Sequence, residues 1–96
     1  MVDDLTSTCG TIVAASKILE ANGARNIYAA VTHGLVNDQG AERLRKSHIK
    51  ELIVTDSTPQ KSYPGVQITV LSVAEIIGEA IHRIHNNQSV SGLFKL

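Results

Sequence analysis

Two adjacent carboxylates and a run of small residues with hydroxyl groups stand at the start of this 96-residue chain. Asp3 and Asp4 are followed by Thr-Ser-Thr-Cys-Gly-Thr at residues 6–11. Small residues let backbone N–H groups approach a phosphate closely, and the hydroxyls of Thr8 and Thr11 can donate to its oxygens. Carboxylates do not bind phosphate, but they suit sugar hydroxyls or Mg²⁺, bound directly or through water. The pattern therefore indicates an anion site beside a diol or metal site.

The motif is neither of the two common phosphate loops. It lacks the Gly-Lys-Ser/Thr ending of a Walker A loop, and it lacks the Gly-x-Gly-x-x-Gly of a dinucleotide loop. Taken alone, it is interpreted equally well as a helix N-terminus with two surface aspartates. The surrounding elements must decide between these interpretations.

Those elements alternate between helix and strand. The predicted helices cover 11–22, 39–47 and 72–85, where apolar residues recur at helical spacing. The predicted strands cover 26–32, 51–55 and 66–71. The first strand is almost continuously apolar, which is typical of burial on both faces. The alternation predicts an α/β fold, a three-layer αβα arrangement with a parallel sheet and right-handed crossovers.

Local signals place the ends of these elements. Gly23 stands where a glycine commonly follows a helix. Ser72 and Glu75 have the spacing of a capping box. Met1 and Val2 are too few for a strand, so the acidic loop is expected to lack most of its supporting strand. We therefore expect a piece of a larger domain, whose exposed sheet edge and apolar helix faces favour self-association.

Residues 2–12 (VDDLTSTCGTI) resemble the phosphoribosyl-pyrophosphate signature of type I phosphoribosyltransferase-fold proteins. Three further stretches narrow the resemblance to the ribose-phosphate pyrophosphokinases. These are 28–34 (YAAVTHG), 53–59 (IVTDSTP) and 81–94 (IHRIHNNQSVSGLF), in the order and spacing of that family. The resemblance implies that residues 1–96 form a single C-terminal phosphoribosyltransferase-like half domain, without the N-terminal ATP-binding half.

Such enzymes transfer the diphosphoryl group of ATP to the C1 hydroxyl of ribose 5-phosphate, giving phosphoribosyl pyrophosphate and AMP, with Mg²⁺ as cofactor. The resemblance implies that Asp3 and Asp4 hold the ribose hydroxyls and organise the metal-bound substrate. The implied ribose-5-phosphate site comprises Asp3, Asp4, Ser7, Thr8, Cys9, Gly10 and Thr11. The family usually has an acid at the position of Ser7, and its ATP site lies mostly outside this chain. We therefore expect no turnover by the isolated chain, although the family is a transferase.

The C-terminal stretch carries a second implication of the resemblance. Family enzymes have a regulatory ADP or phosphate site at a subunit interface, to which Ser89, Ser91 and Phe94 would contribute. The alternative is a polar turn with a docked phenylalanine. The implied partners are ribose 5-phosphate, ATP, and further copies of the chain or other synthase subunits.

The composition of the chain limits which partners and which cellular settings are expected. Nine acidic and nine basic side chains balance, and aromatic residues make up 3%, so neither nucleic acid nor an anionic membrane is an expected partner. No apolar run is long enough to span a bilayer. The single cysteine, Cys9, cannot form an internal disulfide, which favours a reducing, cytoplasmic setting. Its place near a helix N-terminus favours a thiolate, but a role as a small packing residue is the preferred interpretation.

Other polar residues are open to two interpretations. His33 follows a strand at its carboxyl end, where α/β sites gather, or it is a strand-end packing residue. His82 and His85 have a metal-binding spacing but no evident third ligand, which favours a solvated or capping role. The basic residues between Arg43 and Lys46 are interpreted as a solvated helix face.

Two functions compete with that of a synthase fragment. One is a noncatalytic paralogue that regulates active subunits, which the loss of an acid at Ser7 favours. The other is a stand-alone phosphate-binding interaction module. A phosphoribosyltransferase acting on a base has less support, because no base-specific segment is present.

Overall fold

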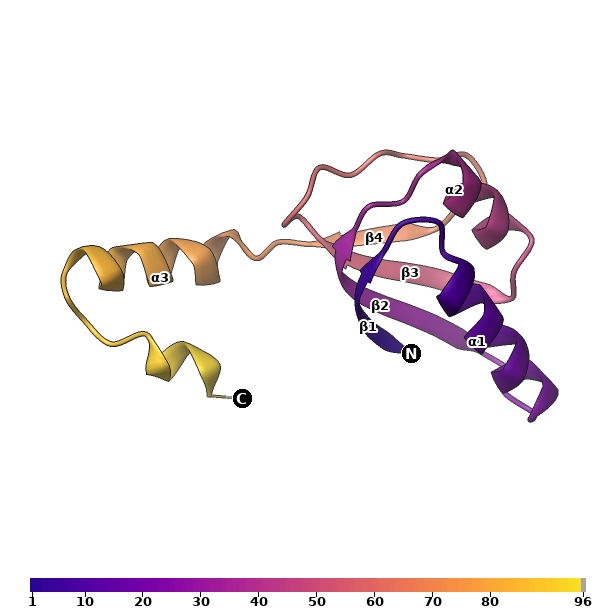
Figure 1. The fold of residues 1–96 in the computed structure, drawn as a ribbon, viewed down its shortest axis with the longest axis horizontal. Coiled ribbons are helices and arrows are strands. Elements are labelled where there is room, and N and C mark those ends of the chain that lie inside the picture. The colour runs from indigo at the N-terminus through magenta and orange to yellow at the C-terminus, as the bar shows by residue number, and fades with distance from the viewer. Residues whose placement is uncertain (96) are drawn as a thin grey trace.

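The computed structural model describes residues 1–95, which form an open parallel sheet, two helices packed on it, and a C-terminal arm (Figure 1). The strands are β1 (Val2–Thr6), β2 (Ile27–Gly34), β3 (Ile49–Thr55) and β4 (Ile68–Leu71), paired in that order. The helices are α1 (Gly10–Ala21), α2 (Asp38–Arg45) and α3 (Ala74–His85), followed by the 3-10 helix η1 (Ser91–Phe94). All three strand pairs are parallel, so the predicted α/β class with a parallel sheet is confirmed.

The acidic pair lies on a strand. β1 is a five-residue strand, so the prediction of a two-residue stub was wrong. Asp3 pairs with Val31 of β2, and the N–H of Ala30 donates to the carbonyl of Met1 at 2.9 Å. Aspartate disfavours strands by itself, so the pairing with β2 overrides local propensity here. The loop is correspondingly shorter than expected and covers only Ser7 to Cys9.

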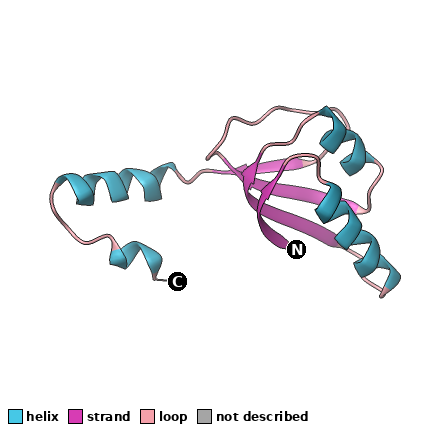
Figure 2. Ribbon diagram, in the orientation of Figure 1, coloured by secondary structure: helices cyan, strands magenta, loops and turns pink. Residues whose placement is uncertain are grey.

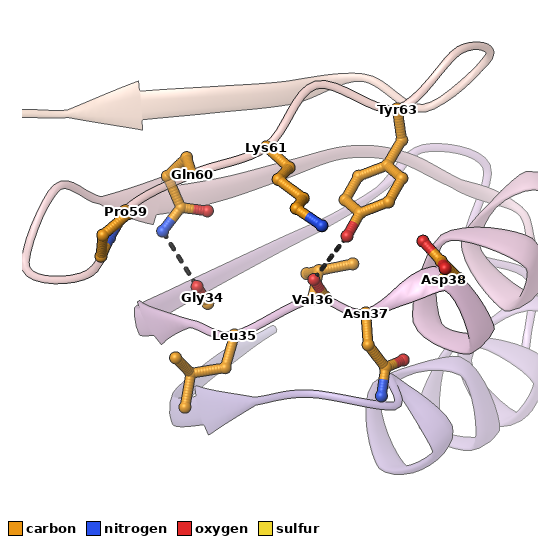
Figure 3. Close-up of a pocket in the computed structure, with 9 residues that line it drawn as sticks. All are labelled: Gly34, Leu35, Val36, Asn37, Asp38, Pro59, Gln60, Lys61 and Tyr63. Atoms are coloured by element: carbon orange, nitrogen blue, oxygen red, sulfur yellow. Dashed lines mark hydrogen bonds between the residues drawn. The ribbon is translucent and has the colours of Figure 1, made fainter.

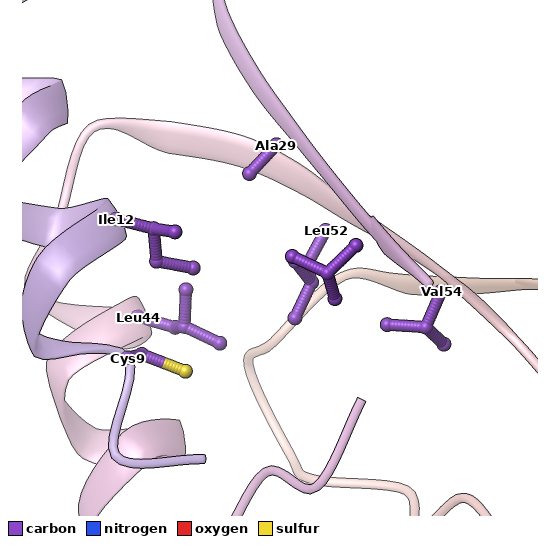
Figure 4. Packing of buried hydrophobic residues seen from close by; sticks show 7 residues of the cluster. Cys9, Ile12, Ala29, Leu44, Leu52 and Val54 are labelled. Atoms are coloured by element: carbon purple, nitrogen blue, oxygen red, sulfur yellow. The ribbon is translucent and has the colours of Figure 1, made fainter. Parts of the chain in front are cut away.

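The hydrophobic core lies between the sheet and helices α1 and α2 (Figure 4). Ala29 and Leu52 are neighbours in the sheet register, and Leu52 and Val54 are fully buried. Ile12 from α1 and Leu44 from α2 close the core from the helical side. Each fully buried aliphatic side chain of this kind stabilises the fold by roughly 1.5–3 kcal/mol. This packing fixes both helices against one face of the sheet.

The opposite face of the sheet is open. Burial alternates along β2, with Ile27 and Ala29 buried while Tyr28 is 46% exposed. The expectation that this strand is buried on both faces was therefore wrong for the described chain. The reason is the position of α3, which follows β4 and runs away from the sheet with η1 (Figures 1 and 2). Of the three layers expected, residues 1–95 thus contribute the sheet and one helical layer.

The helix ends follow the sequence signals only in part. Gly23 adopts a positive φ of 93° after α1, as predicted. The capping box at Ser72 and Glu75 is not formed, because Val73 is the N-cap of α3. The backbone N–H of Val73 donates instead to the carboxylate of Asp56, at 2.8 Å. Hydrogen bonds from the Ser72 hydroxyl and from this N–H lower the pKa of the Asp56 carboxyl.

Candidate functional site

The turn from β1 into α1 forms a hollow of about 200 Å³. Asp3, Leu5 and the residues from Thr6 to Ile12 line it. Cys9 makes the turn possible by adopting a left-handed conformation, with φ 58° and ψ 13°. This region is uncommon for residues other than glycine, and such backbone strain tends to occur at functional sites. The sequence motif and a concave surface therefore coincide.

The start of α1 offers free hydrogen-bond donors to this hollow. Within residues 1–95, the backbone N–H groups of Cys9 to Ile12 meet no protein acceptor, whereas Val13 already donates to the Cys9 carbonyl at 3.0 Å. No side chain caps the helix, and its first turn has no acidic residue. Unpaired N–H groups and the positive end of the helix dipole favour an anion here. Thr8 and Thr11 add hydroxyl groups to the same lining.

The two carboxylates do not act as a pair on this hollow. Consecutive residues of a strand point to opposite faces, and Asp3 lines the hollow while Asp4 is absent from its lining. The Asp3 carboxylate also accepts the backbone N–H of Asp4 at 2.9 Å. Mg²⁺ is commonly held by one or two carboxylates together with water and substrate phosphates. Asp3 fits such a shared site, and no group of three His, Cys, Asp or Glu side chains within residues 1–95 forms a dedicated one.

Cys9 packs in the core and is unsuited to nucleophilic chemistry. It is 1% exposed and belongs to the buried cluster with Ile12 and Leu44. Burial raises the pKa of the Cys9 thiol, and this outweighs the lowering effects of the Thr6 hydroxyl and the Arg43 charge. The preferred interpretation of this cysteine as a packing residue is therefore favoured by its surroundings.

Helix α2 and its N-cap contact the backbone of the loop, and the sequence did not predict these contacts. The Ser7 carbonyl accepts the N–H of Asn37 at 3.3 Å, and Gly40 packs directly under the same carbonyl. Arg43 Nη1 donates to the carbonyl of Thr8 at 2.9 Å. The interpretation of Arg43 as part of a solvated face was therefore wrong. A glycine inside a helical pattern signals close backbone approach, and Arg43 lies three residues further along the same face of the helix.

A second hollow, of about 350 Å³, was not anticipated (Figure 3). The end of β2 with the segment after it, and the long connection between β3 and β4, line this hollow. Tyr63 donates its hydroxyl to the carbonyl of Val36 at 2.8 Å, and the Gln60 amide donates to the carbonyl of Gly34 at 2.9 Å. These bonds tie the long connection to the carboxyl end of β2.

His33 lies near the carboxyl end of β2. It pairs in register with Leu5 of β1, which lines the first hollow. Its Nδ1 is 2.8 Å from the Ser57 hydroxyl. The expectation that His33 lies near the site agrees with this placement.

The C-terminal residues lie apart from the hollow, at the end of the arm (Figure 1). Ser91 is in η1 and donates its N–H to the Ser89 hydroxyl at 3.2 Å. Phe94 is 80% exposed, so the alternative of a docked phenylalanine was wrong. The side-chain amide of Asn86 donates to the carbonyl of His82 at 2.8 Å, so Asn86 caps the end of α3. His82 and His85 are exposed, in keeping with a solvated role.

A parallel α/β sheet whose first strand leads through a small-residue turn into an uncapped helix is an arrangement in which α/β proteins commonly bind phosphate. The family model of the phosphoribosyl synthetase-associated domain matches residues 1–95, and the chain belongs to that family. The resemblance seen in the sequence motifs is therefore confirmed. No helix within residues 1–95 has the length and apolarity needed to cross a membrane.

Individual relatives agree with the family. A ribose-phosphate pyrophosphokinase of Oceanobacillus iheyensis is 47% identical over 95 residues, covering 98% of this chain and 30% of that protein. The chloroplastic ribose-phosphate pyrophosphokinase 2 of Arabidopsis thaliana is 44% identical over 96 residues, covering 98% of this chain and 24% of that protein. The phosphoribosylpyrophosphate synthetase structure from Mycobacterium smegmatis aligns with a TM-score of 0.81 at 35% identity, over 90% of this chain and 29% of that one. The chain thus spans less than a third of the length of these proteins.

Proposed function

We propose that this chain is the ribose-5-phosphate-binding part of a ribose-phosphate pyrophosphokinase and corresponds to the C-terminal portion of that enzyme. The observation that carries the proposal is the set of unpaired N–H groups from Cys9 to Ile12, whose residues line the same hollow as Asp3. In this assignment the N–H groups and the hydroxyls of Thr8 and Thr11 bind the 5-phosphate. Asp3 accepts hydrogen bonds from the ribose hydroxyls, and Asp4 contributes through water or the metal.

The proposed reaction is the transfer of the ATP diphosphoryl group to the ribose C1 hydroxyl. Catalysis of phosphoryl transfer rests mainly on positioning and on stabilising charge, so a rigid phosphate anchor contributes by fixing where C1 lies. Mg²⁺ would neutralise phosphate charge, held by Asp3 and, through water, by Asp4. ATP would be held mostly by residues outside the chain. Assembly with further synthase subunits, regulation through Ser89, Ser91 and Phe94, and a cytoplasmic location belong to the same proposal.

Replacing Asp3 by asparagine is expected to weaken ribose 5-phosphate binding by about tenfold or more. A hydrogen bond to a charged group contributes about 1.5–3 kcal/mol, and that contribution is lost when the carboxylate is removed. The measurement is an NMR titration that follows the backbone amides of Cys9 to Ile12. Asp4→Asn is the matched control and should have the smaller effect, while the Asp3→Ala/Asp4→Ala double variant should abolish binding. If the unaltered chain does not bind ribose 5-phosphate, the stand-alone interaction module becomes the better assignment.

The regulatory paralogue is a second candidate, favoured by Ser7 at a position where the family usually has an acid. The isolated chain is expected to show no turnover, and multiple turnovers in a coupled AMP-release assay would contradict this. The chain can also be mixed with a separately expressed ATP-binding half. Restored turnover would identify a catalytic part, whereas altered ADP inhibition of an intact synthase without new turnover would identify a regulator.

A further inference from the structure

We infer that Arg43 is a positioning residue of the phosphate loop, and that its guanidinium adds positive charge that favours a phosphate bound there. The inference rests on the proposed function, because it concerns the same hollow. It adds a residue 35 positions away from the loop motif, on a different helix.

The loop cannot balance a phosphate by itself. Residues 1–16 include Asp3 and Asp4 but no lysine or arginine. The end of a helix provides the equivalent of only about half a positive charge. A phosphate monoester carries close to two negative charges at neutral pH, and Asp3 adds a further negative charge to the same hollow. Any cation that the chain itself supplies beside the loop must therefore come from another segment.

Arg43 is a cation from another segment that contacts the loop directly. Its Nη1 donates to the Thr8 carbonyl at 2.9 Å, and a Cβ atom built on Gly10 would lie 3.2 Å from the same nitrogen. The guanidinium therefore rests against the first residue of α1, next to the unpaired N–H groups. The side chain is partly buried, so water screens its charge less than it screens the charge of a fully exposed arginine.

The charge of Arg43 is not neutralised by a carboxylate in the part of the chain that the structure describes. Glu42, its neighbour, forms ion pairs with Arg45 at 2.8 Å and Lys46 at 3.0 Å instead. A guanidinium has five N–H donors, and the Thr8 carbonyl is the one acceptor that Arg43 meets within residues 1–95. Arg43 does not line the hollow itself, so its charge acts on a bound anion from behind the loop.

The same bond holds the loop in shape. The bond from Arg43 fixes the Thr8 carbonyl, which directly precedes Cys9. The left-handed conformation of Cys9 is unfavourable without such support. Arg43 therefore has two separable effects: a structural one on the backbone and an electrostatic one on the anion. Only the second depends on the charge of the ligand.

The test compares Arg43→Gln and Arg43→Lys with the unaltered chain. Arg45→Gln is the matched control, because Arg45 is on the same helix but contacts Glu42 and the Pro64 carbonyl. Ribose 5-phosphate and inorganic phosphate are titrated at constant ionic strength, at pH 5 and at pH 8. A urea unfolding curve for each variant shows that the fold is kept.

Arg43→Gln is expected to weaken ribose 5-phosphate binding at least tenfold at pH 8, while Arg45→Gln has no effect. The loss should be smaller at pH 5, because the phosphate loses part of its second charge below about pH 6. Arg43→Lys should keep affinity within a few fold of the unaltered chain. Unchanged binding by Arg43→Gln overturns the inference, and so does an equal loss at both pH values or an equal loss in the glutamine and lysine variants. Absence of binding by the unaltered chain removes the proposed function as well, so the two failures are distinguishable.

Discussion

Gly40→Ala is expected to lower the free energy of unfolding by about 1–3 kcal/mol and to abolish phosphate binding, although alanine is the better helix former. The Cβ atom would enter the van der Waals shell of the Ser7 carbonyl oxygen and lie 3.1 Å from Cys9 Sγ. The carbonyl belongs to backbone that α2 already holds through Asn37, so it cannot turn aside without moving the loop. The loop and α2 must separate, which displaces the N–H groups at the start of α1.

The control for Gly40→Ala is Gly78→Ala, because Gly78 is also inside a helix but a Cβ atom added there would meet no tertiary neighbour within 4 Å. Glycine loses more backbone freedom on folding than alanine does. Gly78→Ala should therefore be neutral or should stabilise the chain by up to about 1 kcal/mol. Urea unfolding monitored by circular dichroism measures both variants, and ribose 5-phosphate titration measures the loop. Equal stabilisation by the two alanines would show that α2 does not press against the loop.

The contrast between these glycines shows where sequence reasoning succeeds. All helices and strands except β1 and the short η1 were predictable because their signals are local: apolar periodicity marks the helices, and Gly23 marks the end of α1. The loop was recognisable for the same reason, since its residues are contiguous. Local signals also misled, because Ser72 and Glu75 have the right spacing for a capping box while Asp56 makes the bond.

The support of the loop could not be predicted, because it depends on contacts between segments distant in sequence. Arg43 and Gly40 reach the loop only because the core packing of Leu44 and Ile12 brings α2 beside α1. β1 was missed for a similar reason. Two aspartates argue against a strand, and only the neighbouring β2 supplies the partners that make one. The motif could therefore be identified without the structure, but the residues that shape it could not.

The chain is expected to self-associate through α3 and the open face of the sheet. Ile76, Ile77, Ile81 and Ile84 are each 48–66% exposed, and Tyr28 is 46% exposed on the uncovered sheet face. Full burial stabilises by roughly 1.5–3 kcal/mol for each isoleucine, against an association cost of about 4–15 kcal/mol. The two ranges overlap, and the isoleucines are already partly buried, so the association is expected to be weak and to depend on concentration. Sedimentation velocity over a range of concentrations should therefore show species larger than the monomer.

The triple variant Ile77→Lys/Ile81→Lys/Ile84→Lys is expected to shift the chain to the monomer without unfolding the sheet, since the buried core contains no residue of α3. Ile18→Lys is the matched control, because Ile18 is 65% exposed on α1 and lies outside this stripe. A twelve-residue helix is only marginally stable in water when nothing covers it. The helical circular dichroism signal of the unaltered chain should therefore fall on dilution, in step with dissociation. A chain that remains monomeric at every concentration, with an unchanged helical signal, would show that α3 is stable uncovered and that its isoleucines do not drive assembly.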